Sequence, residues 1–110
     1  MMPKYLSKDA KGRFIRKMRN MDGVNKCEYC HLPLTSTTRT IDHLLPLSRG
    51  GVNAQTNLVL CCKTCNNAKA DLTLAEFVVF VSLNGGIERT KEIFGKGAHS
   101  RARQVQEIVA

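Results

Sequence analysis

The sequence is poor in aromatic residues and in long apolar runs. It has no tryptophan, and phenylalanine and tyrosine together make up only 5% of its 110 residues, so the hydrophobic core of so short a chain is expected to be thin. No apolar run is long enough to cross a bilayer, and the first residues have neither the apolar core nor the cleavage site of a signal peptide. We therefore expect one small, soluble, cytoplasmic domain with no membrane partner.

Acidic residues are also scarce. There are 17 Lys and Arg residues against 9 Asp and Glu residues, which gives a formal net charge of +8 and a pI near 9.6. Residues 1–26 alone contribute +6 of this charge. A basic segment of this kind indicates a polyanionic partner.

The basic segment is expected to form a helix over residues 7 to about 21, which begins at Ser7 or Asp9 and ends at the following Asp-Gly pair. Its charged face could be merely solvated, as charge runs usually are. It could also follow a phosphate backbone, with an affinity that depends on salt and not on base sequence. The candidates for phosphate contact on this helix are Arg13, Arg16 and Lys17.

Four of the five cysteines are spaced as metal ligands. Cys27 and Cys30 form one C-x-x-C motif, and Cys62 and Cys65 form another, which is the usual arrangement of a four-cysteine structural Zn²⁺ site. Buried free thiols or a redox C-x-x-C are the alternatives, but redox motifs occur singly. Because neighbouring strand residues point to opposite faces, we expect the fifth cysteine, Cys61, to pack as a small hydrophobic side chain.

Between the two motifs the sequence predicts an antiparallel hairpin with a long loop. Residues 35–47 are rich in β-branched side chains and should form a strand that ends near Pro46, and residues 57–61 should form its partner. A helix should follow from residue 63 or 64 to about residue 72.

The C-terminal third is expected to be helical. Thr73 and Glu76 form a capping-box pattern at the start of a strongly apolar helix, which the Asn-Gly-Gly of residues 84–86 should end. A short amphipathic helix, a glycine-rich break at residues 95–97 and a last helix should follow. The apolar helix is best explained as core, or as a dimer face if it is apolar all round.

Zinc alone leaves several polar residues unexplained. Asp42 and His43 stand side by side at the end of the first predicted strand. On the following helix Asn66 lies about 100° from Cys65, so it can face the hairpin while Cys65 faces zinc, and Lys69 lies on the same face as Asn66. The Asp42 carboxylate and the Asn66 amide oxygen would then offer hard ligands with open positions, which suit Mg²⁺ or Mn²⁺.

These motifs follow one another in a familiar order. The first C-x-x-C, "DHLLPLSRGG", the "NL" of residues 57–58 and "CKTCNNAK" resemble the signature of the HNH endonuclease family over residues 27 to about 71. The resemblance implies a ββα-metal fold with a four-cysteine zinc site. The final His of the family's name is replaced by Asn66, so the chain is similar to an H-N-N variant.

The resemblance also implies a reaction, the metal-dependent hydrolysis of DNA phosphodiester bonds to leave a 3′-hydroxyl and a 5′-phosphate. By this likeness His43 is the general base, Asp42 and Asn66 hold a catalytic Mg²⁺, Mn²⁺ or Ni²⁺, and Asn57 fixes the loop that orients the imidazole. A neutral imidazole, with a pKa near about 6.5, can take a proton from water at neutral pH. One such site cuts one strand at a time, so a monomer should nick DNA.

Each of these residues also has an ordinary explanation. An Asp before a His can simply cap a turn, and Asn57 and Asn66 can belong to a turn and a helix cap. Their joint occurrence at these spacings favours the catalytic interpretation. Arg49 in the glycine-rich loop and Lys69 are either ordinary charges or phosphate contacts, and we favour phosphate contacts for both.

We therefore expect an α+β fold in a single domain over residues 1–110. A basic helical arm occupies residues 1–26, zinc knuckles and a ββα-metal core occupy residues 27–72, and helices occupy residues 73–110. The expected function is a nicking DNA endonuclease; the alternative is a zinc-dependent DNA-binding module with weak or no catalysis. Small proteins with this resemblance are often phage-encoded, and a homodimer or a larger terminase-like partner are both open.

Overall fold

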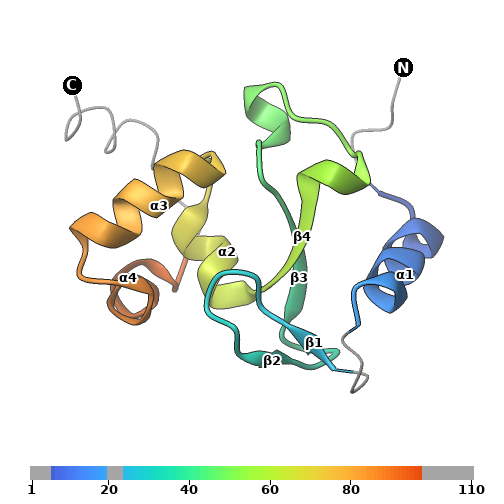
Figure 1. The fold of residues 1–110 in the computed structure, drawn as a ribbon, viewed down its shortest axis with the longest axis horizontal. Coiled ribbons are helices and arrows are strands. Elements are labelled where there is room, and N and C mark those ends of the chain that lie inside the picture. The colour runs from blue at the N-terminus through green and yellow to red at the C-terminus, as the bar shows by residue number, and fades with distance from the viewer. Residues whose placement is uncertain (1–5, 20–23, 98–110) are drawn as a thin grey trace.

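Two short antiparallel hairpins, four α-helices and two short 3-10 helices make up the regular structure of the described part of the chain, residues 6–19 and 24–97 of a computed structural model (Figure 1). The elements are, in chain order, α1 (Lys8–Lys17), β1 (Asn25–Lys26), β2 (Pro33–Leu34), β3 (Arg39–His43), the 3-10 helices η1 (Leu47–Arg49) and η2 (Gln55–Asn57), β4 (Leu58–Cys62), α2 (Lys63–Lys69), α3 (Leu74–Leu83) and α4 (Ile87–Phe94). The α+β fold class expected from the sequence is confirmed.

Helix α1 begins where the sequence places its cap. The side chain of Ser7 accepts a hydrogen bond from the amide of Ala10 at 3.1 Å, which satisfies one of the free N–H groups of the first turn. The helix is charged on most of its surface and buries only Phe14. It ends at Lys17, before the expected residue 21, and residues 20–23 lie outside the described part. In Figure 1 it stands to one side of the longer hairpin.

The longer hairpin pairs β3 with β4 antiparallel, as expected from the sequence, and its register runs from Arg39 opposite Cys62 to His43 opposite Leu58. The strand ends at His43 and not near Pro46. Regular strand pairing does not continue beyond this point, because the backbone amide of Leu45 donates to the Asn57 side chain. All five residues of β4 are buried, so this strand is the centre of the fold.

Helix α2 follows β4 directly and completes a β-β-α unit. It ends at Lys69, before residue 72, and Ala70 continues the chain with a φ of 49°. The capping box predicted for the next helix is present, with Thr73 and Glu76 each bonded to the other's backbone amide. The last predicted helix lies outside the described residues.

The core is divided into two small clusters, in agreement with the low aromatic content. One joins α1, the first cysteine turn and β4 around Phe14 and Leu60. The other lies beneath α3 and α4 around Leu72, Phe77 and Phe80. Among the described residues no helix combines the length and the apolar character that a membrane span requires.

Candidate metal centre and active site

Four cysteines converge between the short hairpin and the start of α2. The ligand atoms of Cys27, Cys30, Cys62 and Cys65 all lie within 4.8 Å of one another, and the Cys30 and Cys62 sulfurs are 3.8 Å apart. Four sulfurs about 2.3 Å from a central zinc form a tetrahedron with edges of about 3.8 Å. The cluster is therefore positioned to bind a metal and has dimensions that zinc fits.

Local backbone geometry prepares the cluster. In each motif the amide of the second cysteine points at the first sulfur at 3.4 Å, from Cys30 to Cys27 and from Cys65 to Cys62. The hydrogen bond with Cys65 lowers the pKa of Cys27 to about 4, and the same bond, together with burial, raises the pKa of Cys65. Four thiolates this close repel one another, so all four can ionise only around a cation.

Cys61 is not part of the cluster. It is fully buried, its sulfur lies 3.3 Å from the hydroxyl of Thr40, and burial raises the pKa of its thiol. The alternation of side chains along β4 turns Cys61 away from its neighbour Cys62. The structure thus places Cys62 in the cluster and packs Cys61 as a small buried side chain, as expected from the sequence; ligation of a metal by Cys62 stays a prediction.

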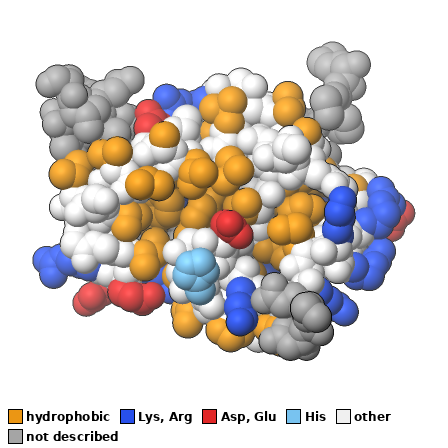
Figure 2. Space-filling view, viewed as in Figure 1, with side chains coloured by type: hydrophobic (Ala, Val, Ile, Leu, Met, Phe, Trp, Pro, Cys, Tyr) orange, Lys and Arg blue, Asp and Glu red, His pale blue; other side chains and the backbone are white. Residues whose placement is uncertain are grey.

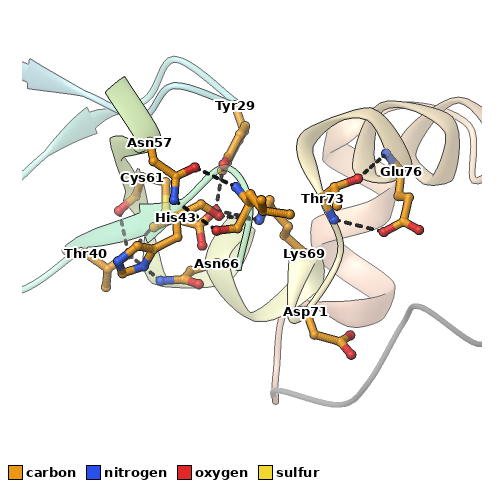
Figure 3. Close-up of polar contacts among 12 residues, drawn as sticks. Tyr29, Thr40, His43, Asn57, Cys61, Asn66, Lys69, Asp71, Thr73 and Glu76 are labelled. Carbon is orange, nitrogen blue, oxygen red and sulfur yellow. Dashed lines mark hydrogen bonds and ion pairs between the residues drawn. The ribbon is translucent and has the colours of Figure 1, made fainter. Parts of the chain in front are cut away.

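Asp42 is almost completely buried, with 7% of its surface exposed. Its Oδ2 accepts a hydrogen bond from the hydroxyl of Tyr29 at 2.6 Å and lies 3.0 Å from the ammonium of Lys69. Lys69 also donates to the backbone oxygen of His43 at 2.9 Å. Figure 3 shows Tyr29 and Lys69 reaching this point from the cysteine turn and from α2. A buried carboxylate is thus paired with a buried cation, as burial of either charge requires.

The place of Lys69 differs from the sequence-based expectation. We expected a phosphate contact, but the side chain has no exposed surface and its ammonium is used by Asp42 and His43. The expected face of α2 is right, since Lys69 does turn toward the hairpin. A long side chain on that inward face reaches the buried carboxylate before it reaches solvent, so the structure does not support a phosphate contact.

Asn66 lies on the same face of α2 as Lys69. It contacts the face of β3 that carries Asp42. Its amide nitrogen donates to the hydroxyl of Thr40 at 3.0 Å (Figure 3). Thr40 and Asp42 are two residues apart on the strand, so their side chains point to the same side. In the part of the chain that the structure describes, no hydrogen bond reaches the amide oxygen of Asn66 or the Oδ1 atom of Asp42.

His43 is half-buried at the end of β3, and a loop amide holds its ring. Its Nε2 lies 2.7 Å from Oδ1 of Asn53. Asn57 holds the two sides of this loop together: its amide oxygen accepts from the amide of Leu45 at 2.8 Å, and its nitrogen donates to the carbonyls of Leu45 and Val52 at 3.0 and 2.8 Å. One side chain therefore fixes the path of the loop that carries the partner of the imidazole.

Arg49 in the same loop is paired with α3. Its guanidinium forms an ion pair and hydrogen bonds with Glu76, and it also donates to the backbone oxygen of Asp71 at 3.4 Å. The pair raises the pKa of Arg49 and lowers the pKa of Glu76. About a third of the Arg49 side chain, 30%, is exposed, so a phosphate could reach it only by sharing it with Glu76.

The basic side chains of α1 are exposed and lie beside the hairpin. Figure 2 shows Lys and Arg gathered over the α1 side of the molecule, and Arg13, Arg16 and Lys17 belong to this exposed surface. The ammonium of Lys17 donates to the side chain of Gln55 in the loop at 2.7 Å. A groove of about 380 Å³ separates α1 from β3, and its lining includes Lys11 and Arg39.

Two residues that hold the site together were not found from the sequence. Tyr29 is hidden between two cysteines, where it can be taken for filler in a knuckle turn, and Asn53 is one of several polar residues in a polar loop. Nothing in the spacing connects Tyr29 with Asp42 or Asn53 with His43. Tertiary contacts alone bring these pairs together.

The fold and the cysteine cluster define a small ββα domain with a four-cysteine metal centre. Residues 27–79 match the family model described as HNH endonuclease, which supports the assignment of this part of the chain to that family. The chain is also similar to the CRISPR-associated endonuclease Cas9 of Corynebacterium diphtheriae, with 32% identity over 72 residues. This similarity covers 60% of the chain but only 7% of the relative.

Proposed function

We propose that this protein is a metal-dependent DNA endonuclease that hydrolyses one phosphodiester bond at a time. The observation that carries the proposal is the packing of α2 against β3. The side chain of Asn66 contacts Thr40, and Lys69 of the same helix contacts Asp42 and the backbone of His43, so the three candidate residues lie on two elements in contact. The match of residues 27–79 to a nuclease family model supports the proposal.

The roles follow from the contacts. The imidazole of His43, held through Nε2 by Asn53, takes the proton of the attacking water. Asn57 fixes the loop and so keeps that imidazole oriented. The imidazole is half-buried at the strand end, whereas the Asp42 carboxylate is buried beside Tyr29 and Lys69, so their proposed roles differ: His43 exchanges a proton with water and Asp42 serves as a ligand.

The residues also fit a second metal ion. The Oδ1 atom of Asp42 and the amide oxygen of Asn66 are hard donors that accept no hydrogen bond within the described structure, and such oxygens suit Mg²⁺ or Mn²⁺, with Ni²⁺ as a further cation to test. When bound, this ion would stabilise negative charge that develops on the scissile phosphate. The cysteine cluster would hold Zn²⁺ as a structural ion.

DNA would lie along the basic side of the hairpin. The groove between α1 and β3 is lined by Lys11, Arg39 and Thr40, and Thr40 is the residue that Asn66 contacts. A phosphate backbone in the groove would meet the exposed cations of α1 and lead toward His43. Cleavage of both strands would need a second copy or a larger terminase-like partner, and a bacterial or phage-infected cytoplasm is the proposed setting.

A second candidate function is a DNA-binding module with weak or no catalysis. One observation favours it: Asp42 is buried and its Oδ2 is already used by Tyr29 and Lys69. If this arrangement excluded a metal, the domain would bind DNA without cutting it. Both candidates therefore predict DNA binding, and only the first predicts cleavage.

A plasmid-relaxation assay separates them. Supercoiled DNA at low salt is incubated with Mg²⁺, Mn²⁺ or Ni²⁺, and the open-circular product is measured for the wild type, His43→Ala and His31→Asn. His31 is an exposed histidine with a φ of 65°, which asparagine tolerates, so this variant is the matched control. We expect nicking by the wild type and the control alone; DNA binding without nicking under every metal would establish the module instead.

A further inference from the structure

The first cysteine motif does more than hold metal, because the residue between its ligands reaches the candidate active site. Tyr29 lies in the turn between Cys27 and Cys30, and its hydroxyl donates to Oδ2 of Asp42 at 2.6 Å. Its ring packs edge-on against Phe77 of α3, with centroids 5.2 Å apart. The turn is tied to the hairpin by a 2.9 Å backbone bond from Glu28 to Leu60. The position of the hydroxyl is therefore fixed from several sides.

The hydroxyl constrains the orientation of the carboxylate. Tyr29 and Lys69 both approach Oδ2 of Asp42, at 2.6 and 3.0 Å. A carboxylate with two donors on one oxygen cannot rotate without breaking both contacts. Its other oxygen, Oδ1, is then held in one direction. Carboxylates that ligate metals are commonly oriented in this way by their hydrogen-bond partners.

We propose that Tyr29 is a positioning residue for the divalent metal of the active site, acting through Asp42. This inference rests on the proposed function. Because Tyr29 is part of the metal-binding turn, it also connects the cysteine cluster with the reacting end of the hairpin. A hydroxyl with a purely structural role needs only one hydrogen-bond acceptor of any kind. The Tyr29 hydroxyl instead donates to Oδ2 of Asp42, the same atom that the buried ammonium of Lys69 contacts.

The test removes the hydroxyl and keeps the ring. Tyr29→Phe, Asp42→Asn and the wild type are loaded with Zn²⁺, their zinc content is measured, and Mn²⁺ affinity is determined by calorimetry without DNA. Thr90→Val is the matched control, because it deletes a buried hydroxyl on α4 whose acceptor, the Gly86 carbonyl, keeps its backbone bond.

We expect Tyr29→Phe to keep one zinc per chain and to bind Mn²⁺ about 10-fold more weakly, the lower end of the effect of removing such a partner. Nicking should fall in parallel at limiting Mn²⁺ and recover at saturating Mn²⁺, while Thr90→Val matches the wild type. Unchanged Mn²⁺ affinity in Tyr29→Phe would overturn the inference, and so would loss of zinc, because the hydroxyl would then serve the turn alone. If Asp42→Asn bound Mn²⁺ like the wild type, the proposed metal site itself would be wrong.

Discussion

At the scale of single residues, the buried pair of Asp42 and Lys69 limits what the site can do. Both side chains are removed from water, and the Lys69 ammonium lies 3.0 Å from Oδ2 of Asp42, so that each compensates the charge of the other. Removing one partner of such a pair leaves an uncompensated buried charge, which is far more costly than losing a surface ion pair. Lys69 is therefore a structural requirement of the carboxylate that the proposed chemistry uses.

Lys69→Met keeps much of the side-chain volume and removes the charge. We expect it to lower the free energy of unfolding by about 3–5 kcal/mol, measured by urea denaturation at a constant free-zinc concentration. Lys26→Met, at an exposed position of β1, should change it by no more than about 0.5 kcal/mol. Equal effects of the two substitutions would show that the buried ion pair has no special energetic role.

The candidate site residues could be selected from the sequence, but the side chains that form hydrogen bonds with them could not. Asp42, His43 and Asn66 were found because strand and helix periodicities place them at one end of the hairpin. The contacts of Tyr29 and Asn53 depend on how the knuckle and the loop pack, and spacing alone does not contain that information. Lys69 was placed on the right face of its helix, but its depth of burial could not be predicted.

At the scale of elements, the loop between β3 and β4 behaves as an ordered unit. Asn57 makes three hydrogen bonds across it, to Leu45 and Val52. Each bonds a backbone group that the strands leave unpaired. The hairpin and α2 could be predicted from β-branched runs and helix periodicity. The end of β3 at His43 could not be predicted, because the Asn57 side chain, from the far end of the loop, replaces the backbone pairing there.

Asn57→Ala should loosen this loop without unfolding the domain. We expect faster amide hydrogen exchange at Leu45, whose N–H donates to the Asn57 side chain, together with a loss of nicking of about 10-fold or more, because a mispositioned base slows the reaction. Exchange is followed by NMR and nicking by plasmid relaxation. Protection at Leu45 equal to that of the wild type would contradict the proposed role of Asn57.

At the scale of the whole molecule, two thin core clusters are both in contact with Tyr29 and Ile87, and the four-cysteine cluster lies within the first of them. The cysteine cluster brings the short hairpin against the end of β4 and the start of α2, and α4 adds a hydrogen bond from Lys91 to the Cys30 sulfur at 3.3 Å. Burial alone would lower the pKa of Lys91, but the neighbouring sulfurs raise it. A small domain with few aromatic residues is expected to depend on such a centre.

Chelation of zinc should therefore unfold the protein, and the two adjacent cysteines should respond differently. We expect Cys62→Ala to lose zinc and native far-UV circular dichroism, and Cys61→Ala to keep one zinc per chain with a moderate loss of stability. Metal content is measured after dialysis. Zinc lost from Cys61→Ala but kept by Cys62→Ala would mean that the assignment of the fourth ligand is reversed.

The charge distribution also makes a prediction for the whole molecule. Replacing Arg13, Arg16 and Lys17 together by Gln should reduce the slope of log affinity against log salt by about 0.9 for each DNA phosphate that α1 no longer neutralises. Lys26→Gln, outside α1, is the control. Fluorescence anisotropy with a short duplex measures both, and an unchanged slope in the triple variant would show that α1 does not contact the DNA backbone.

The most direct test of the central claim is the single-turnover nicking rate of a labelled DNA duplex at saturating protein and Mn²⁺, for the wild type, His43→Ala and His31→Asn. The account predicts that His43→Ala still binds the duplex but cuts at least about 100-fold more slowly, as loss of a general base requires, while His31→Asn cuts at the wild-type rate. The product should carry a 3′-hydroxyl and a 5′-phosphate. A rate for His43→Ala equal to that of the wild type, with the fold intact, would contradict the assignment of this site as the catalytic centre.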